Sequence, residues 1–340
     1  MSIFIIIVGI SLLILVHELG HFLAAKFFNV KVEEFGFGFP PRILAKKIGE
    51  TRYSLNLLPF GGFVRLLGEN PLSPISESER HRSFSHQAAW RRTIIIVAGV
   101  LMNFLLGWFI ISGLFLFGSA RQLGITLVLP DTPAAQIGLR EGDLIFGFDR
   151  AQDFINFVDQ NRGKEIVLDV QRGEELLSFN IVPREKTAAG EGALGIGIGE
   201  LGYPKLSFAR SLVEGFMTTL KITVAIFTAI INLFIGLLTG SAALQSFVGP
   251  IGIFQVANET GALGLPFLFN LVALISLNLL VLNILPFPAL DGGRLFFILI
   301  EKIKGSPIGA QKESIANAIG FFILLLLMIA VTIKDIIYLF

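Results

Sequence analysis

The chain has 340 residues, of which 53% are hydrophobic and 16% are charged, and its formal net charge is +1. A soluble domain carries about 25% charged residues, so this composition indicates a membrane protein. No basic excess exists to neutralise phosphates, which counts against nucleic acid as a partner. There is no cysteine, so disulfides and thiolate metal sites are excluded, and any metal must be held by histidine and carboxylate side chains.

Four segments are apolar over the about 20 residues of helix that a hydrocarbon core requires. The first, residues 3–16, continues through HELGH into FLAAKFF, and the others are residues 93–117, 266–285 and 319–333. A fifth segment, residues 222–238, is also uncharged, and hydropathy alone makes it a span. The chain is therefore predicted to be a polytopic α-helical membrane protein.

Basic residues concentrate in two connecting regions. Lysine and arginine are frequent at residues 31–92 and again at residues 294–312. By the positive-inside tendency, both regions face the cytoplasm. The N-terminus and residues 118–205 are then expected on the outside, because a loop of that size translocates largely regardless of its charge.

Residues 118–200 carry the strand and turn patterns of a small soluble domain. GITLVLP, LIFGF, EIVLDVQ and LLSFNIVP are predicted strands, DTPAAQIGL is a turn into a short helix, and AQDFINFVDQN is a helix. Roughly 80 residues are enough for a domain that folds alone. The glycine-rich segment TAAGEGALGIGIGE is either a linker or the last strand.

His17, Glu18 and His21 form an HExxH motif inside the first apolar segment. Positions i and i+4 share one face of a helix, so both imidazoles can bind one metal while Glu18 lies beside them. The alternative is that both histidines are structural residues of the helix, hydrogen-bonded to neighbouring groups and without a metal. Three ionisable groups so close together in a membrane span are costly and functional by default, so the motif predicts a metal site.

A catalytic zinc has three protein ligands and an open position, so HELGH leaves one ligand to find. His81 and His86 lie in the charged stretch SERHRSFSHQ, where a surface position is expected. Asp291, in NILPFPALDGGRLFF, is the better candidate, although an Asp before a helix is also a common N-cap. By itself, LDGG leaves the ligand and the cap equally open.

The neighbours of Asp291 indicate an unusual backbone. Pro286 and Pro288 break the preceding helix. Gly292 and Gly293 permit conformations that other residues resist. A special loop conformation is therefore expected at Asp291.

Together these motifs resemble the site-2 protease family of intramembrane zinc metalloproteases, and most closely its bacterial regulator-of-sigma-E protease type. The resemblance covers most of the chain and rests on VHELGHF, FGFGF, PFGGFVRL, AGVLMNF, VGPIGI and NILPFPALDGG, while TPAAQIGLREGDLI resembles a PDZ domain. It implies that His17, His21 and Asp291 are zinc ligands. Glu18 is then the catalytic base, and Asn283 contacts the substrate backbone near the scissile bond.

The same resemblance implies the fold and its domains. The expected parts are residues 1–117 as the first half of the protease core with a re-entrant β-hairpin region at 32–67, residues 118–200 as an extracytoplasmic, inserted α+β PDZ domain, residues 201–265 as a membrane-apposed amphipathic helix region, and residues 266–340 as the second half of the core. Two features depart from the family. The second apolar segment has GVLMN where GPxxN is common, and there is room for one PDZ domain where this type often has two.

One metal ion cannot be bound from opposite sides of a bilayer, so the three ligands must lie at one depth. His17 is about 14 residues, or roughly 21 Å, into a helix that enters from outside, which places it in the inner half of the membrane. The span at 266–285 must then also run inward, which requires that 222–238 does not cross. Residues 211–240 are therefore expected to form a membrane-apposed or partly inserted amphipathic helix.

This topology gives four transmembrane helices, and the resemblance implies a bacterial inner membrane. Both termini and the PDZ domain are expected on the extracytoplasmic side, with the active site toward the cytoplasm. The predicted activity is zinc-dependent hydrolysis of a peptide bond in or near the transmembrane segment of single-span membrane proteins, with Glu18 as the base. Substrates of the family include membrane-bound anti-sigma factors and remnant signal peptides.

Several alternatives stay open or are less favoured. An extended substrate could pair with the hairpin, or the hairpin could be a plain cytoplasmic one, and the PDZ domain could bind peptide termini or exclude bulky ectodomains. A catalytically silent scaffold whose PDZ domain captures partners is disfavoured, because HELGH and LDGG are both intact. A transporter with an intramembrane proton relay explains neither the i,i+4 spacing nor the PDZ pattern.

Overall fold

The computed structural model describes residues 2–70, 72–119, 121–173, 175–187, 191–239 and 249–339. The chain divides into two compact units. The first, here called the helical unit, comprises Met1–Ser112, Leu212–Asn258 and Leu268–Phe340, and the second, the sheet unit, comprises Gly113–Ser211 and Glu259–Phe267. Val248 of the VGPIGI motif and residues 240–247 of the expected amphipathic region lie outside the described residues.

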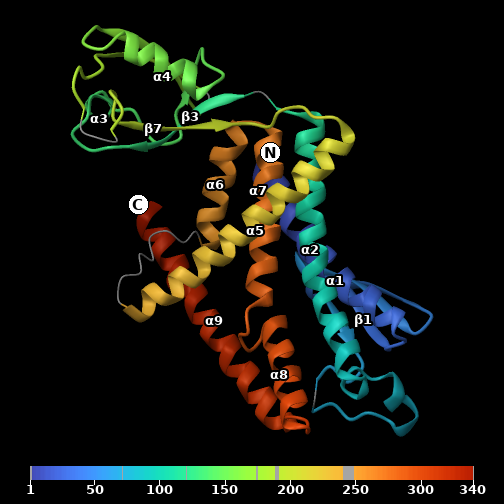
Figure 1. Cartoon of the computed structure of the whole chain (residues 1–340). Helices are drawn as coiled ribbons and strands as arrows, with labels where there is room; N and C mark the ends of the chain where they lie inside the picture. The colour runs from blue at the N-terminus through green and yellow to red at the C-terminus, as the bar shows by residue number, and fades with distance from the viewer. Residues whose placement is uncertain are drawn as a thin grey trace. The chain divides into compact units, whose positions relative to one another are not determined.

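Five helices among the described residues are long and apolar enough to span a membrane (Figure 1). They are α1 (Ser2–Phe27), α2 (Ala89–Phe117), α5 (Phe208–Thr239), α7 (Leu265–Ile284) and α9 (Ala310–Leu339). The four predicted spans are thus confirmed as long apolar helices. By length and composition α5 joins them, as hydropathy alone had indicated.

α1 and α7 pack in parallel. A Cβ on Gly9 of α1 would lie 2.8 Å from a methyl group of Val272 in α7, so the two helices are in close contact there. Further along both helices, the Asn283 amide nitrogen of α7 lies 3.5 Å from the His17 ring of α1. Because both contacts advance in the same direction along the two helices, α1 and α7 have the same orientation.

α2 crosses α1 in the opposite direction, at a point where both helices carry glycine. A Cβ on Gly20 would lie 2.3 Å from the carbonyl oxygen of Ala98 and 2.8 Å from the Cα of Gly99. Small residues at a crossing let two helix backbones approach closely. Asn103, one turn further along α2, lies beside His17, so α2 is antiparallel to α1.

A bent β-hairpin follows α1. Asn29 has a left-handed φ of 58° and ends the helix, and β1 (Val32–Ile48) then pairs antiparallel with β2 (Thr51–Leu66). Phe35 pairs with both Tyr53 and Val64, so the start of β1 lies between the two parts of β2. The other side of Gly62–Leu66 has no strand partner among the described residues, which makes this end of β2 an edge strand.

Two groups of ion pairs hold the hairpin. The carboxylate of Glu34 is 2% exposed and lies 2.9 Å from the guanidinium of Arg42. At the turn between the strands, Glu50 pairs with Lys26 of α1 at 2.8 Å and with Arg82 at 2.7 Å. The hairpin is therefore fixed both within itself and to the end of α1.

The sheet unit contains a five-stranded antiparallel sheet of strand order β6-β5-β4-β3-β7. Its elements are β3 (Gln122–Val128), α3 (Pro133–Gln136), β4 (Leu144–Ile145), α4 (Ala151–Gln160), β5 (Ile166–Arg172), β6 (Glu175–Ile181) and β7 (Ile196–Leu201). Phe154 and Val158 of α4 share a buried core with the strands. The predicted strands and helices of this region are confirmed, and the glycine-rich segment supplies the last strand.

The remaining elements belong wholly or in part to the helical unit. They are the short 3-10 helices Glu77–Arg82 and Phe84–His86, α6 (Pro250–Ala262) and α8 (Asp291–Lys304). α5 packs along α2: the Trp108 ring nitrogen donates to the Leu212 carbonyl at 2.9 Å, and Val100 and Ile230 share a buried cluster. In Figure 1, α5 runs obliquely across α2 and α7.

Candidate metal centre

Asp291 is the first residue of α8, and its side chain does not cap that helix. The N-cap residue is Leu290, which makes no side-chain cap. The Asp291 Oδ2 atom instead lies 3.1 Å from His17 Nε2 and 3.2 Å from His21 Nε2. The N-cap alternative is therefore excluded.

The loop before Asp291 explains the two glycines that follow it. Neither Gly292 nor Gly293 has a positive φ, so the special loop conformation expected around Asp291 does not depend on these glycines. A Cβ on Gly292 would lie 2.1 Å from the carbonyl oxygen of Leu285, and one on Gly293 would lie 2.3 Å from that of Phe287. Glycine is required because the end of α7 folds directly under the first turn of α8. The unusual conformation occurs at Ala289, whose φ is 76°.

His17, His21 and Asp291 together fit a zinc ion. The two Nε2 atoms are 3.2 Å apart, so the three candidate ligand atoms form a nearly equilateral triangle. Ligands of a tetrahedral zinc, each about 2.0–2.1 Å from the metal, are about 3.3 Å from one another. The Asp291 Oδ2 atom is also buried without a hydrogen-bond partner among the described residues, as expected for an oxygen that binds a metal ion.

α2 fixes the orientation of His21. The ring donates from Nδ1 to the main-chain carbonyl of Ile95 at 2.8 Å, which leaves the lone pair of Nε2 for a metal. A Cβ on Gly99 would lie 2.3 Å from His21 Nε2. Gly99 is therefore the residue that makes room for the ring.

Asn103 of α2 has the corresponding role at His17. Its side chain is fully buried, with the amide nitrogen 3.4 Å from His17 Nδ1 and an amide oxygen that has no hydrogen-bond partner among the described residues. A half-turn of the amide lets that oxygen accept from Nδ1–H. The Nε2 lone pair of His17 then faces the same point as that of His21.

Glu18 shares a cavity with the three metal-binding candidates. This cavity has a volume of about 240 Å³ and is lined by His17, Glu18, His21 and Asp291. The Glu18 carboxylate accepts a hydrogen bond from the main-chain N–H of Val64 in β2 at 3.0 Å. The structure thus brings together the four residues that the sequence predicted for the site. The hydrogen bond from the hairpin holds the Glu18 carboxylate in place.

Comparison with known protein families matches residues 5–327 to peptidase family M50. The chain belongs to peptidase family M50. Relatives of this M50 protease match it over nearly its whole length. It is 35% identical to a protein of Clostridium perfringens that is provisionally named a zinc metalloprotease, over 98% of this chain and 97% of the relative. It is 30% identical to the regulator of sigma-W protease RasP of Bacillus subtilis and to the zinc metalloprotease RasP of Geobacillus kaustophilus, in both cases over 98% of this chain and 97% of the relative.

The M50 protease is therefore a multi-pass membrane zinc metalloprotease of the site-2 protease family, and the predictions of family, enzyme class and cofactor are confirmed. The predicted surface positions of His81 and His86 are also confirmed, because both residues are exposed.

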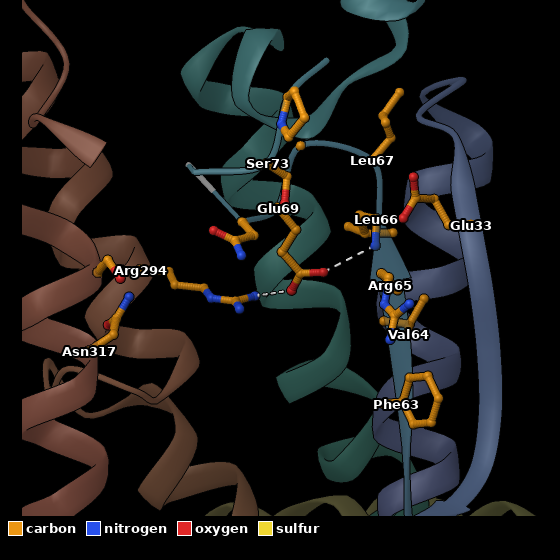
Figure 2. Close-up of a pocket in the computed structure, with 14 residues that line it drawn as sticks. Glu33, Phe63, Val64, Arg65, Leu66, Leu67, Glu69, Ser73, Arg294 and Asn317 are labelled. Carbon is orange, nitrogen blue, oxygen red and sulfur yellow. Dashed lines mark hydrogen bonds and ion pairs between the residues drawn. The ribbon is translucent and has the colours of Figure 1, made fainter. Parts of the chain in front are cut away.

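Two charged residues beside the metal cavity had not been predicted. Arg294 donates to Glu69 Oε1 at 2.6 Å, and the other oxygen of Glu69 accepts from the N–H of Leu66 at 3.1 Å (Figure 2). A signal existed for Arg294, which directly follows LDGG and so lies one helical turn from Asp291. Nothing in the sequence around Glu69 indicates its partner.

Proposed function

We propose that this M50 protease cleaves single-span membrane proteins within or next to their transmembrane segment. The observation that supports this most is the convergence of His17, His21 and Asp291 in one cavity with Glu18. His17 and His21 come from α1, and Asp291 follows α7. Since both helices are long enough to span the membrane, the cavity suits a substrate that is itself in the membrane.

In this proposal His17, His21 and Asp291 are the ligands of zinc, which when bound supplies Lewis-acid activation of water at neutral pH. Glu18 takes a proton from the attacking water and delivers it to the nitrogen of the leaving amine. The hydrogen bond from Val64 N–H holds one oxygen of Glu18. Its other oxygen is left for the proton.

Asn283 is proposed to contact the substrate main chain. Its amide nitrogen lies 3.5 Å from His17 Nε2, so the side chain is at the rim of the metal centre. A donor in this position can hold a substrate carbonyl beside the scissile bond. Negative charge develops on the carbonyl oxygen of the scissile bond in the transition state. Hydrogen-bond donors near that oxygen stabilise the transition state most.

The hairpin is proposed to be re-entrant and to bind the substrate in extended form. Main-chain carbonyls in a helix are hydrogen-bonded, so a transmembrane helix must unwind before it is cut. The edge formed by Gly62–Leu66 lines the metal cavity through Phe63, Val64 and Leu66. An unwound substrate that adds to this edge as a strand would regain part of the hydrogen bonding it lost, while the Val64 N–H stays with Glu18.

The membrane topology is proposed to have four spans. α1 and α7 are parallel and α2 is antiparallel to α1, so α2 ends on the side of the membrane where α7 begins. The chain between α2 and α7 therefore crosses the membrane either not at all or an even number of times. If α5 crossed, a second crossing would be needed. α6 has 13 residues, about 20 Å of helix, which is short of the about 30 Å hydrocarbon core. We therefore infer that α5 is partly inserted and that both termini are extracytoplasmic.

The sheet unit is proposed to be an extracytoplasmic PDZ domain, in residues 118–200. Its edge strand β7 lies next to α4, and a cavity of about 300 Å³ between them is lined by Phe154 and Val158 of α4 and by Ile196 and Ile198 of β7. An apolar groove beside a free strand edge suits an extended peptide. This favours the binding of a peptide terminus, such as the one left when another protease trims the substrate.

The physiological substrates are proposed to be membrane-bound anti-sigma factors or remnant signal peptides in a bacterial inner membrane. The name of the Bacillus subtilis relative links that protein to the regulation of sigma-W. The catalytically silent scaffold is the alternative function. A scaffold has no need of a catalytic metal, so this alternative predicts that the purified protein does not hold one equivalent of zinc at the His-His-Asp cluster.

The substitution Glu18→Gln tests the activity. It keeps the volume of the side chain and its acceptor for Val64 N–H but removes the base, so zinc should stay bound at one equivalent while cleavage falls by about 10²–10⁴-fold. Unchanged cleavage would contradict the proposed role of Glu18. Asp291→Ala should lose the zinc that the unmodified protein holds. Zinc that stays bound to Asp291→Ala would contradict Asp291 as a ligand, and an unmodified protein without bound zinc would favour the scaffold.

A further inference from the structure

A second, more polar cavity adjoins the metal cavity. It has a volume of about 720 Å³ and is bounded by the end of β2, the turn after it, α8 and α9 (Figure 2). The residues common to both cavities are Phe63, Val64, Leu66, Glu69 and Arg294. Hydrolysis as proposed above uses the metal cavity and leaves the polar one without a role.

The edge of β2 connects the two cavities, and carboxylates accept from two of its outward N–H groups. Val64 and Leu66 are two residues apart in the strand, so their N–H groups point to the same side, away from β1. The N–H of Val64 donates to Glu18 at 3.0 Å, and that of Leu66 donates to Glu69 at 3.1 Å. A substrate strand that continues along this edge past Glu18 needs the N–H of Leu66, where Glu69 now lies.

Glu69 is held in this place in two ways. Its own N–H donates to the Leu66 carbonyl at 3.1 Å, in a turn where Gly68 has a left-handed φ of 70°. Its carboxylate is bound by Arg294 at 2.6 Å. Because the turn fixes the main chain of Glu69, only the side chain can leave the edge.

The lining of the second cavity indicates what would enter it. Arg65, Asn70, Ser73 and Asn317 all line it, so polar groups meet an incoming chain from β2, from the turn and from α9. Apolar residues of a transmembrane segment would displace water from these groups without replacing its hydrogen bonds. A polar, extended main chain would satisfy them.

We propose that the polar cavity binds the hydrophilic segment that flanks the transmembrane part of the substrate, and that Glu69, held by Arg294, occupies the place of a substrate carbonyl at Leu66 until this segment enters. The inference rests on the proposed function, because it assumes a substrate paired with the edge of β2. It adds a binding site for the flank and makes Glu69 a positioning residue that the flank displaces.

Disulfide crosslinking tests the binding site without cleavage. The chain has no cysteine, so a single introduced cysteine reports one position. In a Glu18→Gln background, Ser73→Cys inside the cavity should crosslink to a single-span peptide with one cysteine in its polar flank, and the product should be lost when excess cysteine-free peptide competes. Ser78→Cys, which is exposed and outside the cavity, is the matched control. Equal crosslinking of both variants would overturn the proposal.

Steady-state kinetics test the role of Glu69. Glu69→Ala frees the Leu66 N–H, so KM should fall about tenfold for a substrate with its polar flank, as expected for one lost hydrogen bond to a charged group. Glu69→Gln keeps an acceptor but loses the ion pair with Arg294, so its KM should fall less; this nearly isosteric change also guards against misfolding of the alanine variant, with zinc content as the check. KM for a substrate cut short before the flank should not change.

The outcomes separate the two proposals. If the unmodified protein cleaves neither substrate, the proposed function fails. If it cleaves both while neither Glu69 variant lowers KM for the flanked substrate, the proposed function stands and the displacement of Glu69 is wrong.

Discussion

Gly99 of α2 lies directly against the imidazole of His21, so close that a Cβ at position 99 would be 2.3 Å from Nε2. The atom it would meet is the one that faces His17 and Asp291. The crossing of α1 and α2 therefore does more than pack two helices. It sets the position of a metal-binding nitrogen.

Gly99→Ala should abolish zinc binding. Alanine in place of glycine normally strengthens a helix by up to about 1 kcal/mol, so any loss of zinc comes from displacement of His21 and not from a weaker α2. Zinc content of the purified protein is the measurement. Gly113→Ala, on the same helix but with nothing within 4 Å of its Cβ, should keep one equivalent. Full zinc occupancy and activity in Gly99→Ala would show that His21 does not depend on this space.

Asn103→Ala should weaken zinc binding by about 10–100-fold, the usual effect of removing the partner that orients a ligating histidine. The loss should appear in the zinc affinity measured by competition with a chelator. Asn278→Ala is the control, because the Asn278 amide is exposed and donates to the Leu274 carbonyl of its own helix. An unaltered affinity in Asn103→Ala would exclude the proposed contact with His17 Nδ1.

Glu34→Ala should loosen the hairpin. Glu34 is 2% exposed and lies within 4.0 Å of Arg42, Arg52 and Arg65, and the loss of a hydrogen bond to a charged group costs about 1.5–3 kcal/mol. Thermal unfolding and limited proteolysis would report the change. The neighbouring Glu33 is exposed, so Glu33→Ala should alter stability by less than about 0.5 kcal/mol. Equal behaviour of the two variants would argue against a structural role for the buried carboxylate.

Glu50 should make the hairpin sensitive to acid. Hydrogen bonds from Arg82 and Lys26 lower the pKa of Glu50 from 4.5 to about 2. Because the pKa is lower in the folded protein than in the unfolded one, the stabilisation is present above pH 4.5 and is lost as the pH falls toward 2. The difference in unfolding temperature between the wild type and Glu50→Gln should therefore shrink over this range. A difference that is constant with pH would refute the prediction.

Local sequence spacing predicted the metal-binding residues well, because His17 and His21 are one helical turn apart and the helix itself brings them together. Asp291 was a candidate as the carboxylate of LDGG, and the family resemblance was needed to make it the third ligand. The supporting contacts could not be predicted in this way. Ile95, Gly99 and Asn103 act through the crossing of α2 with α1, and no local pattern records where two helices cross.

The same limit applies to the contacts between distant elements. Glu69 and Arg294 are 225 residues apart in the chain, and their pairing depends on how β2 approaches α8. The reason for Gly292 and Gly293 was also tertiary, since the carbonyls that crowd them belong to the loop folded beneath α8. For α5, length and hydropathy describe a span, whereas the parallel arrangement of α1 and α7 supports partial insertion.

Cleavage by the reconstituted protein is the most direct measurement of intramembrane proteolysis at this metal centre. Single-span peptides with polar flanks would be incubated with the protein in lipid vesicles, and mass spectrometry would locate the cut. The zinc-loaded wild type should cut within or next to the apolar segment, on its cytoplasmic half, while Glu18→Gln with equal zinc should not. No cut by the zinc-loaded wild type, or the same cut by Glu18→Gln, would contradict a protease centred on Glu18, His17, His21 and Asp291.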